Sequence, residues 1–92
     1  MDAFLRELGT RHKADNATFM VVGHTDDVGD DGRNQALGMG RAMVVRRQLS
    51  KNGIAIARIT ADSKGETEPI ASNETEDGRH QNRRVVITVS PN

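Results

Sequence analysis

One carboxylate and one guanidinium stand at a defined separation in this chain. Asp26 lies in the sequence GHTDD at 23–27, and Arg41 follows 15 residues later, in the sequence NQALGMGRA at 34–42. A strand ending at Asp26, a polar loop and a helix beginning near residue 34 would bring both side chains to the mouth of one turn. A carboxylate that accepts from an ammonium and a guanidinium that grips a carboxylate can together recognise an amino-acid head group without reacting with it. The pair therefore predicts a receptor for a zwitterion.

The strand and the helix that would position this pair have recognisable signals. Residues 17–22 form a continuous, partly β-branched apolar run before a glycine, which predicts a strand buried on both faces. An acidic, glycine-rich loop follows at 26–32, and Asp30 or Asp31 can cap the next helix. That helix carries an apolar stripe at spacings of 4, 3 and 4 residues, made of Gly38, Ala42, Val45 and Leu49.

The flanking elements are expected on either side of this unit. Residues 2–12 place apolar side chains at helical spacing, which predicts a weakly amphipathic helix. Gly53 in the left-handed conformation would end the long helix, with Ile54 folding back on its last turn. A second strand is expected at 56–61.

The C-terminal third is predicted to be a polar segment followed by a strand. Residues 62–82 are expected to form an ordered loop, with a short helical turn after Asn73. In the last strand, 84–89, Val85, Ile87 and Val89 alternate with the residues of a second, partly wet face. Helices that alternate with strands predict an α/β sandwich, in which helices pack on one face of a small mixed β-sheet.

Length and composition allow one folded domain with a small core. The chain has 92 residues, of which 19 are Leu, Ile, Val or Phe, and its 13 basic and 13 acidic residues cancel. Phe4 and Phe19 are the only aromatic residues in the sequence, so stacking on bases or sugars has almost no support. The zero net charge also argues against nucleic acid as a partner.

The sequence predicts neither catalysis nor a cofactor. It contains no cysteine, which excludes a disulfide framework, a thiolate metal site and a cysteine nucleophile. His24 is the only acid-base candidate near the pair, and it has no recognisable partner arrangement. The first residues lack the pattern of a signal peptide, and no stretch is long enough to span a bilayer. If the protein is exported, we expect this chain to be a piece of it.

Plainer interpretations stand beside the functional ones. Asp26 and Arg41 could form a structural ion pair. His24 and His80 could belong to a metal site, although no third ligand has a fixed spacing and a histidine at a strand end is more often buried and hydrogen-bonded. The acidic loop invites a calcium site, yet it lacks the alternating acids and the bidentate Glu of an EF-hand. The basic cluster at 79–84 is interpreted as structural and ligand-facing rather than as a phosphate site.

An ordered series of motifs carries a family resemblance. The motifs are GHTD at 23–26, Gly29, NxxLGxxRAxxV at 34–45, GI at 53–54, RI at 58–59, GExxP at 65–69, NxT at 73–75 and GRxxNRRV at 78–85. Over residues 17–90 the chain resembles the OmpA-like peptidoglycan-binding domain. This family includes the C-terminal domain of outer membrane protein A, the peptidoglycan-associated lipoprotein and the flagellar stator protein MotB. Residues 1–92 are therefore expected to form one OmpA-like domain, a fragment of a larger envelope protein.

The resemblance implies non-covalent anchoring to the cell wall through the diaminopimelate residue of the peptidoglycan stem peptide. In the family, the Asp of GHTD and the Arg of the helix hold the distal amino-acid group of that residue, and these positions fall on Asp26 and Arg41. The implied location is the periplasmic face of the cell envelope, with a tether to the outer or inner membrane outside this chain and no membrane insertion by this segment. The further ligand-binding candidates are Thr25, Asp27, Asn34, Leu37 and Arg83.

Three departures from the family pattern bear on the fold. Family domains begin with an extra strand before the first helix, and its apparent absence predicts an open sheet edge that could pair with a second chain. Ser63-Lys64-Gly65 replaces a common Gly-x-Gly and is expected to reshape a loop far from the Asp26–Arg41 pair. Gly38 replaces a common Ser and, with Gly40, costs the helix about 1 kcal/mol per glycine relative to Ala. Close packing against the helix backbone would explain both glycines.

Two functions from different classes follow. The first is a module that binds diaminopimelate-type peptidoglycan, with Arg41 on the carboxylate and Asp26 on the ammonium. The second is a structural domain that keeps the fold without the ligand and self-associates, as a homodimer, through its open sheet edge. Ligand dependence separates them, because the first requires saturable binding that both Asp26→Ala and Arg41→Ala abolish.

Overall fold

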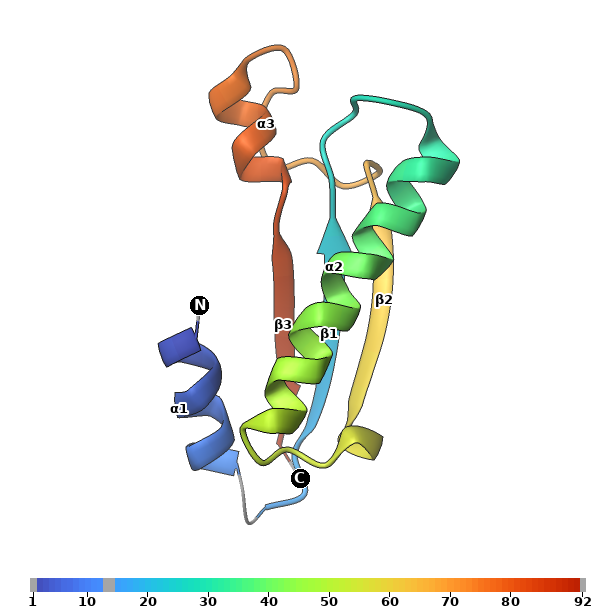
Figure 1. Ribbon diagram of the computed structural model, residues 1–92. Coiled ribbons are helices and arrows are strands. Elements are labelled where there is room, and N and C mark those ends of the chain that lie inside the picture. Colours follow the sequence, from blue (N-terminus) through green and yellow to red (C-terminus); the bar gives the residue numbers. More distant parts are fainter. Residues whose placement is uncertain (1, 13–14, 92) are drawn as a thin grey trace.

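The computed structural model describes residues 2–12 and 15–91. Its elements alternate along the chain, as the periodicities predict (Figure 1). They are α1 (Asp2–His12), β1 (Thr18–His24), α2 (Asp31–Lys51), the 3-10 helix η1 (Ile56–Arg58), β2 (Ile59–Gly65), α3 (Glu76–Asn82) and β3 (Val85–Ser90). Within these residues, no helix combines the length and apolar character needed to cross a membrane.

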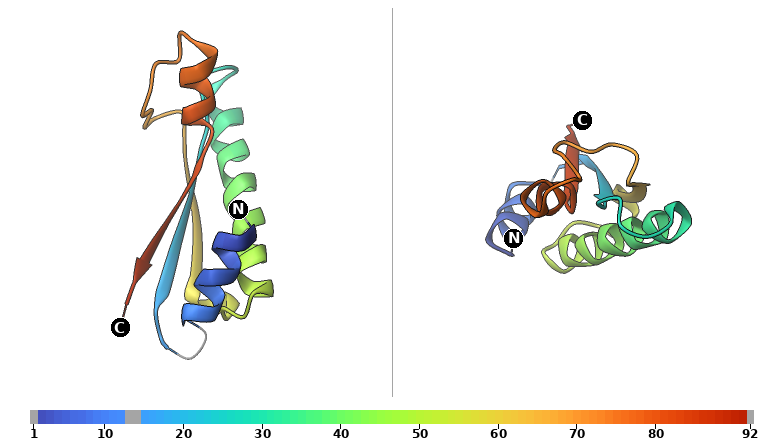
Figure 2. Two further views of the ribbon diagram at one scale, coloured as in Figure 1. Left: turned by 90° about the vertical axis from the view of Figure 1, so that its left-hand side faces the viewer. Right: turned by 90° about the horizontal axis from the view of Figure 1, so that it is seen from above.

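The strands form a mixed sheet with β1 in the centre. The strand order is β2-β1-β3, and β1 runs parallel to β2 and antiparallel to β3. Helices α1 and α2 lie on the same face of this sheet, and α3 stands beyond the end at which β1 finishes and β3 begins (Figures 1 and 2). The predicted α/β architecture, with helices on one face of a small mixed sheet, is confirmed.

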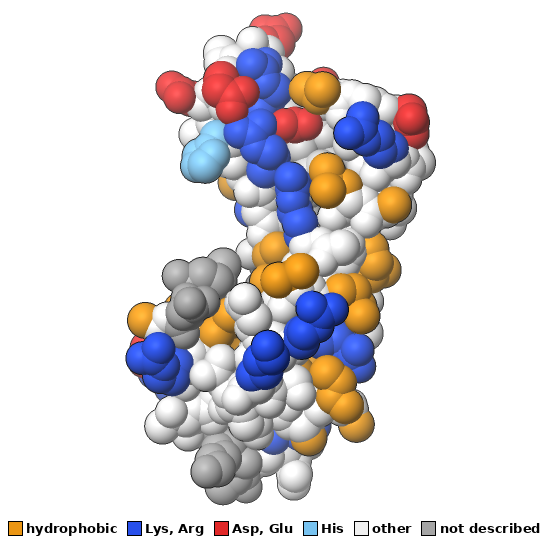
Figure 3. Space-filling model, in the orientation of Figure 1, with side chains coloured by type: hydrophobic (Ala, Val, Ile, Leu, Met, Phe, Trp, Pro, Cys, Tyr) orange, Lys and Arg blue, Asp and Glu red, His pale blue; other side chains and the backbone are white. Residues whose placement is uncertain are grey.

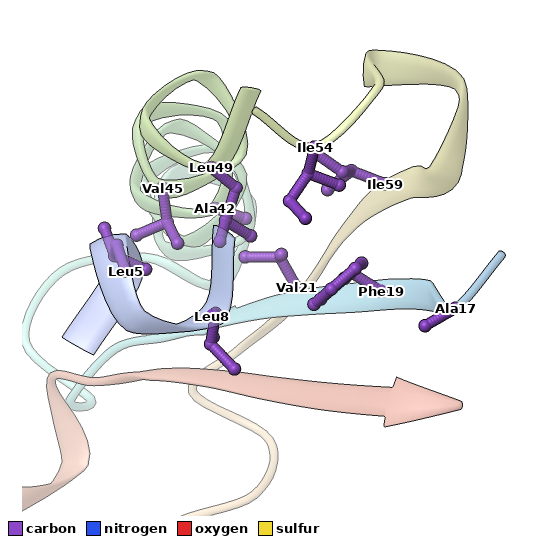
Figure 4. Close-up of a cluster of buried hydrophobic side chains, with 10 residues drawn as sticks. All are labelled: Leu5, Leu8, Ala17, Phe19, Val21, Ala42, Val45, Leu49, Ile54 and Ile59. Atoms are coloured by element: carbon purple, nitrogen blue, oxygen red, sulfur yellow. The ribbon is translucent and has the colours of Figure 1, made fainter. Parts of the chain in front are cut away.

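The core lies between the sheet and helices α1 and α2 (Figure 4). Phe19 and Val21 of β1 point into it, and Val85, Ile87 and Val89 of β3 pack against its edge as predicted. The buried hydrophobic residues of this cluster are Leu5, Leu8, Ala17, Phe19, Val21, Ala42, Val45, Leu49, Ile54 and Ile59.

The prediction that β1 is buried on both faces is wrong. Its exposure alternates along the strand, and Met20 is 41% exposed on the side away from α1 and α2. The alternation of exposure could not be predicted from the sequence, because residues on both faces of the strand are apolar. A continuous apolar run does not show whether a strand is covered on two faces or on one.

The boundaries around the loop differ from those expected. β1 extends to His24 rather than ending at residue 22 or at Asp26. Helix α2 begins at Asp31, three residues before the expected start near Asn34. Its N-cap is Asp30, one of the two candidates, whose carboxylate accepts a 2.7 Å hydrogen bond from the backbone N–H of Arg33.

The expected strand at 56–61 and the expected loop at 62–82 both need correction. Residues 56–58 form η1, and β2 begins at Ile59 and continues to Gly65, because pairing with β1 carries the strand through polar residues. The short helical turn expected after Asn73 is present as α3, capped by Thr75, whose hydroxyl accepts from the N–H of Gly78 at 3.0 Å.

Of Gly38 and Gly40 in α2, one is explained by packing. A Cβ on Gly38 would stand 2.3 Å from the hydroxyl of Ser63 and 3.0 Å from the carbonyl oxygen of Gly23, so the helix approaches the sheet closely there. A Cβ on Gly40 would meet nothing within 4 Å, and nothing in the structure explains that glycine. Gly53 ends the helix with φ of 104°, as predicted.

Both outer strands are edges within the part of the chain that is described. β2 and β3 each pair only with β1, and no strand precedes α1 among these residues. The open edge expected from the missing strand and the homodimer that it could support stay predictions.

Candidate functional site

A cavity of about 230 Å³ lies at the end of β1, between the loop that follows this strand, the first half of α2 and the residue after α3. Six of the seven predicted ligand-binding residues line it, and the seventh, Asp27, is exposed and outside the lining. Acidic and basic side chains intermix at this end of the molecule (Figure 3). The lining residues are Thr25, Asp26, Val28, Arg33, Asn34, Leu37, Arg41 and Arg83.

Asp26 is held by two donors. One carboxylate oxygen, Oδ1, accepts from the backbone N–H of Val28 at 3.0 Å, and the other, Oδ2, accepts from Nη1 of Arg83 at 2.8 Å. The side chain is 12% exposed, so it keeps contact with the cavity. The loop thus fixes the direction of this carboxylate.

The environment keeps Asp26 ionised. Burial by itself raises the pKa of its carboxyl group. The hydrogen bonds from Arg83 and from the N–H of Val28, together with the charges of Arg83 and Arg41, outweigh burial and hold the pKa below its usual value. A carboxylate that is charged at neutral pH suits an ammonium ligand.

Arg41 reaches the same cavity without pairing with Asp26. Its Nη1 donates to the carbonyl oxygen of His24 at 3.0 Å. Within the described residues no ion pair joins Arg41 to Asp26. The structural ion pair considered from the sequence is therefore wrong for these two residues, and Arg41 retains donors that can meet a ligand carboxylate.

Arg83 connects the cavity to α3. Besides Asp26, it donates through Nη2 to Glu76 at 2.5 Å, and Glu76 also accepts from Nε of Arg79 at 3.1 Å. The pKa of Arg83 is raised, first by its hydrogen bond to Glu76 and then by that to Asp26. Hydrogen bonds from Arg83 and Arg79 lower the pKa of Glu76. This chain of charges anchors α3 to the loop after β1.

Two buried polar residues form hydrogen bonds with the backbone of the loop after β1. The amide of Asn34 donates to the carbonyl oxygen of Asp26 at 3.3 Å and to the carboxylate of Glu66 at 3.1 Å. The hydroxyl of Thr25 donates to the same carbonyl oxygen at 2.8 Å, and the N–H of Thr25 donates to the carbonyl of Gly65 at 2.9 Å. Asn34 and Thr25 therefore hold the backbone on which Asp26 stands.

The segment Ser63-Lys64-Gly65 is not a distant loop, as the sequence suggested. It forms the end of β2, where Gly65 pairs with His24 and accepts from Thr25. The side-chain amide of Gln35 also donates to the carbonyl of Ser63 at 2.6 Å. Parallel pairing of β2 with β1 brings this segment beside His24 and Thr25, an arrangement that the local sequence could not reveal.

His24 is buried beside the site. It is 3% exposed, and its Nδ1 has no hydrogen-bond partner in the described part of the chain. Burial lowers its pKa, and the charges of Arg84 and Lys64 act in the same direction, against that of Glu68. Among the described residues no three His, Cys, Asp or Glu side chains group as metal ligands do.

Sequence reasoning missed two of the lining residues, Val28 and Arg33. Arg33, Leu37 and Arg41 stand four residues apart, which puts them along one side of a helix. That spacing could have identified Arg33, but the helix was expected to begin one residue after it. Val28 carries no comparable signal, because the conformation of its loop is irregular.

Comparisons with known proteins show the family of this chain. A model described as the OmpA family matches residues 1–83. The chain belongs to the OmpA family. The outer membrane porin F of Pseudomonas fluorescens is 51% identical to it over 69 residues, which cover 75% of this chain and 21% of the porin. The chain thus spans about a fifth of the length of that relative.

Solved structures show the same fold for this OmpA-family domain. The crystal structure of the peptidoglycan-associated lipoprotein from Burkholderia pseudomallei has a TM-score of 0.92 and 33% identity, and covers 97% of this chain and 76% of that chain. The C-terminal domain of MotB from Helicobacter pylori has a TM-score of 0.85 and 26% identity, covering 99% and 72%.

Proposed function

We propose that the domain binds peptidoglycan non-covalently through the diaminopimelate residue of the stem peptide and thereby anchors its parent protein to the cell wall. Membership of the OmpA family and similarity to a peptidoglycan-associated lipoprotein support the cell wall as partner. The parent protein would then lie in the cell envelope, with this domain in the periplasm. The finer proposal concerns the ligand group and the side chains that hold it.

The observation that carries this proposal is the presence of Asp26 and Arg41 on the walls of one cavity without a direct bond between them. The distal end of diaminopimelate carries an ammonium and a carboxylate on one carbon. Asp26 accepts from the ammonium, and the guanidinium of Arg41 donates to the carboxylate. The exposed side chain of Leu37, which lines the same cavity, contacts the methylene chain.

Asp26 has capacity for the ligand in spite of its two donors. A carboxylate offers about four acceptor sites, and Val28 and Arg83 use two of them. The ammonium can therefore bind beside Arg83 without displacing it. A lysine-type stem has the ammonium but no distal carboxylate, so it leaves Arg41 without its partner and binds more weakly.

The experiment is an NMR titration of the folded domain with a soluble stem peptide that contains diaminopimelate. We expect saturable shifts around residues 24–41 in the wild type. Asp26→Ala and Arg41→Ala should each weaken binding by about tenfold or more, because each removes a charge-assisted hydrogen bond of about 1.5 to 3 kcal/mol. Arg47→Ala, an exposed site on the same helix and outside the cavity, serves as control.

A folded wild-type domain without saturable shifts would reject the proposal. So would full retention of affinity in both variants. In that case the open edges of β2 and β3 favour the second function, a ligand-free domain that self-associates. Sedimentation measurements over a range of concentrations would test it, since a dimer gives a mass that rises with concentration.

A further inference from the structure

The cavity holds more positive than negative charge. Its walls carry the guanidinium groups of Arg33, Arg41 and Arg83 and a single carboxylate, that of Asp26. Arg83 is neutralised by Asp26 and, from outside the lining, by Glu76. Two guanidinium groups remain, so a zwitterionic head group, which brings one charge of each sign, does not balance the site.

Arg33 is the guanidinium for which the proposed function has no role. Within the described part of the chain its side chain makes no hydrogen bond or ion pair, and its backbone N–H donates to the carboxylate of Asp30 at 2.7 Å. The position that a Cβ would take on Gly29 lies 3.7 Å from Nη1 of Arg33, so the side chain folds over the loop at this glycine. The neighbouring acids Asp27 and Asp31 are outside the cavity lining.

Arg33 and Arg41 are arranged for two separate groups of one ligand. They stand eight residues apart on α2, which puts their Cα atoms about 12 Å apart along the helix axis, with Leu37 midway. The carboxylate and the ammonium of an amino-acid head group share one carbon. A head group held by Asp26 and Arg41 therefore leaves Arg33 to contact a different part of the ligand.

The apolar surface between these ends favours an elongated, partly aliphatic ligand. Leu37 is 44% exposed and Val28 is 64% exposed, and both line the cavity. Solvent-exposed apolar side chains on one cavity with two guanidinium groups that lack a carboxylate partner suit a chain of methylene groups with an anion at each end.

We propose that Arg33 forms a second carboxylate subsite, which makes the domain selective for stem peptides with a second free carboxylate next to the diaminopimelate. The group that fits this position is the α-carboxylate left free by a γ-linked glutamate. This inference rests on the proposed function. It adds that amidation of the glutamate, a change remote from the diaminopimelate head group, weakens binding through Arg33.

The test uses two tetrapeptides, L-Ala-γ-D-Glu-meso-diaminopimelyl-D-Ala with an amidated C-terminus and the same peptide with the glutamate α-carboxylate amidated. Titration calorimetry measures the affinity of each for the wild type, for Arg33→Gln and for the control Arg47→Gln. We expect the wild type and the control to prefer the free carboxylate by about fivefold, the scale of a partly exposed charge-assisted contact. In Arg33→Gln the two peptides should bind with equal affinity.

The outcomes separate this inference from the proposed function. Binding of both peptides to the wild type with equal affinity would overturn the inference and leave the proposed function standing. A preference of unchanged size in Arg33→Gln would overturn it too, because another group would then read the carboxylate. Failure of both peptides to bind a folded wild-type domain would overturn the proposed function and the inference together.

Discussion

Asp26 forms its ion pair with Arg83, 57 residues further along the chain, at 2.8 Å, while Arg41 turns to the carbonyl oxygen of His24. The pairing has two consequences. It joins the loop after β1 to the end of α3, and it leaves the guanidinium of Arg41 without a carboxylate partner among the described residues. The domain is thus preorganised, with a charged and oriented Asp26 and an Arg41 that lacks a carboxylate partner on one cavity.

Replacement of Arg83 by Gln should raise the pKa of Asp26. In the wild type, the hydrogen bond from Arg83 helps to offset the effect of burial. Because the folded-state pKa is depressed, the ionised carboxyl group stabilises the fold above the unfolded pKa of about 4, and this contribution is lost as the pH falls through the folded pKa. In Arg83→Gln the acid-dependent loss of stability should shrink. Carboxyl carbon NMR titration measures the pKa, with Arg47→Gln as control, and an unchanged Asp26 pKa in Arg83→Gln would contradict this account.

His24 should make the domain less stable in mild acid. Burial lowers its pKa, so as the pH falls below about 6.5 the unfolded chain takes up the proton before the folded one does. Stability then decreases with falling pH, by at most about 1.4 kcal/mol per pH unit for one proton. Thermal unfolding between about pH 7.5 and pH 5.5 should show a smaller pH dependence in His24→Asn than in the wild type. An equal dependence in both would assign the effect to other groups.

Gly38 and Gly40 of α2 should respond in opposite directions to alanine. Gly40→Ala should raise the free energy of unfolding by about 0.5 to 1 kcal/mol, because the new Cβ meets nothing and the unfolded chain loses freedom. Gly38→Ala should lower it by about 1 to 3 kcal/mol, because its Cβ collides with Ser63 and approaches the backbone of Gly23. Urea unfolding measures both, and each variant is the control for the other. A stabilising Gly38→Ala would show that the helix does not lie this close to the sheet.

Asn82 should hold the segment before α3 in place. It is fully buried, its side-chain oxygen accepts from the N–H groups of Ile70 and Ala71, and its amide donates to Ala71 and Asn73. Asn82→Ala should cost about 3 kcal/mol and speed hydrogen exchange at Ile70 and Ala71, since those amides lose their acceptor. Asn73→Ala removes only one of these four bonds and should cost about 1 kcal/mol. Unchanged exchange at Ile70 and Ala71 in Asn82→Ala would contradict this role.

The sequence predicted helices and strands best where one hydrophobic period runs through the whole element. The apolar stripe of α2 and the alternation of Val85, Ile87 and Val89 in β3 were correct because helical and strand periods are local properties. The end of β2 was missed because Asp62, Ser63 and Lys64 resemble a loop, and their strand conformation comes from parallel pairing with β1.

For the candidate site, the sequence by itself determined which groups are available: a strand-end loop with Asp26, followed by a helix whose spacing carries Leu37 and Arg41. Only the tertiary structure decided how the charges combine. Three arginines line the cavity with Asp26, and the choice of Arg83 as its partner depends on where α3 places a residue distant in the chain. Local periodicity determines how side chains are oriented within one helix or strand. An ion pair between two elements depends on their relative positions, and long-range strand pairing and core packing determine those positions.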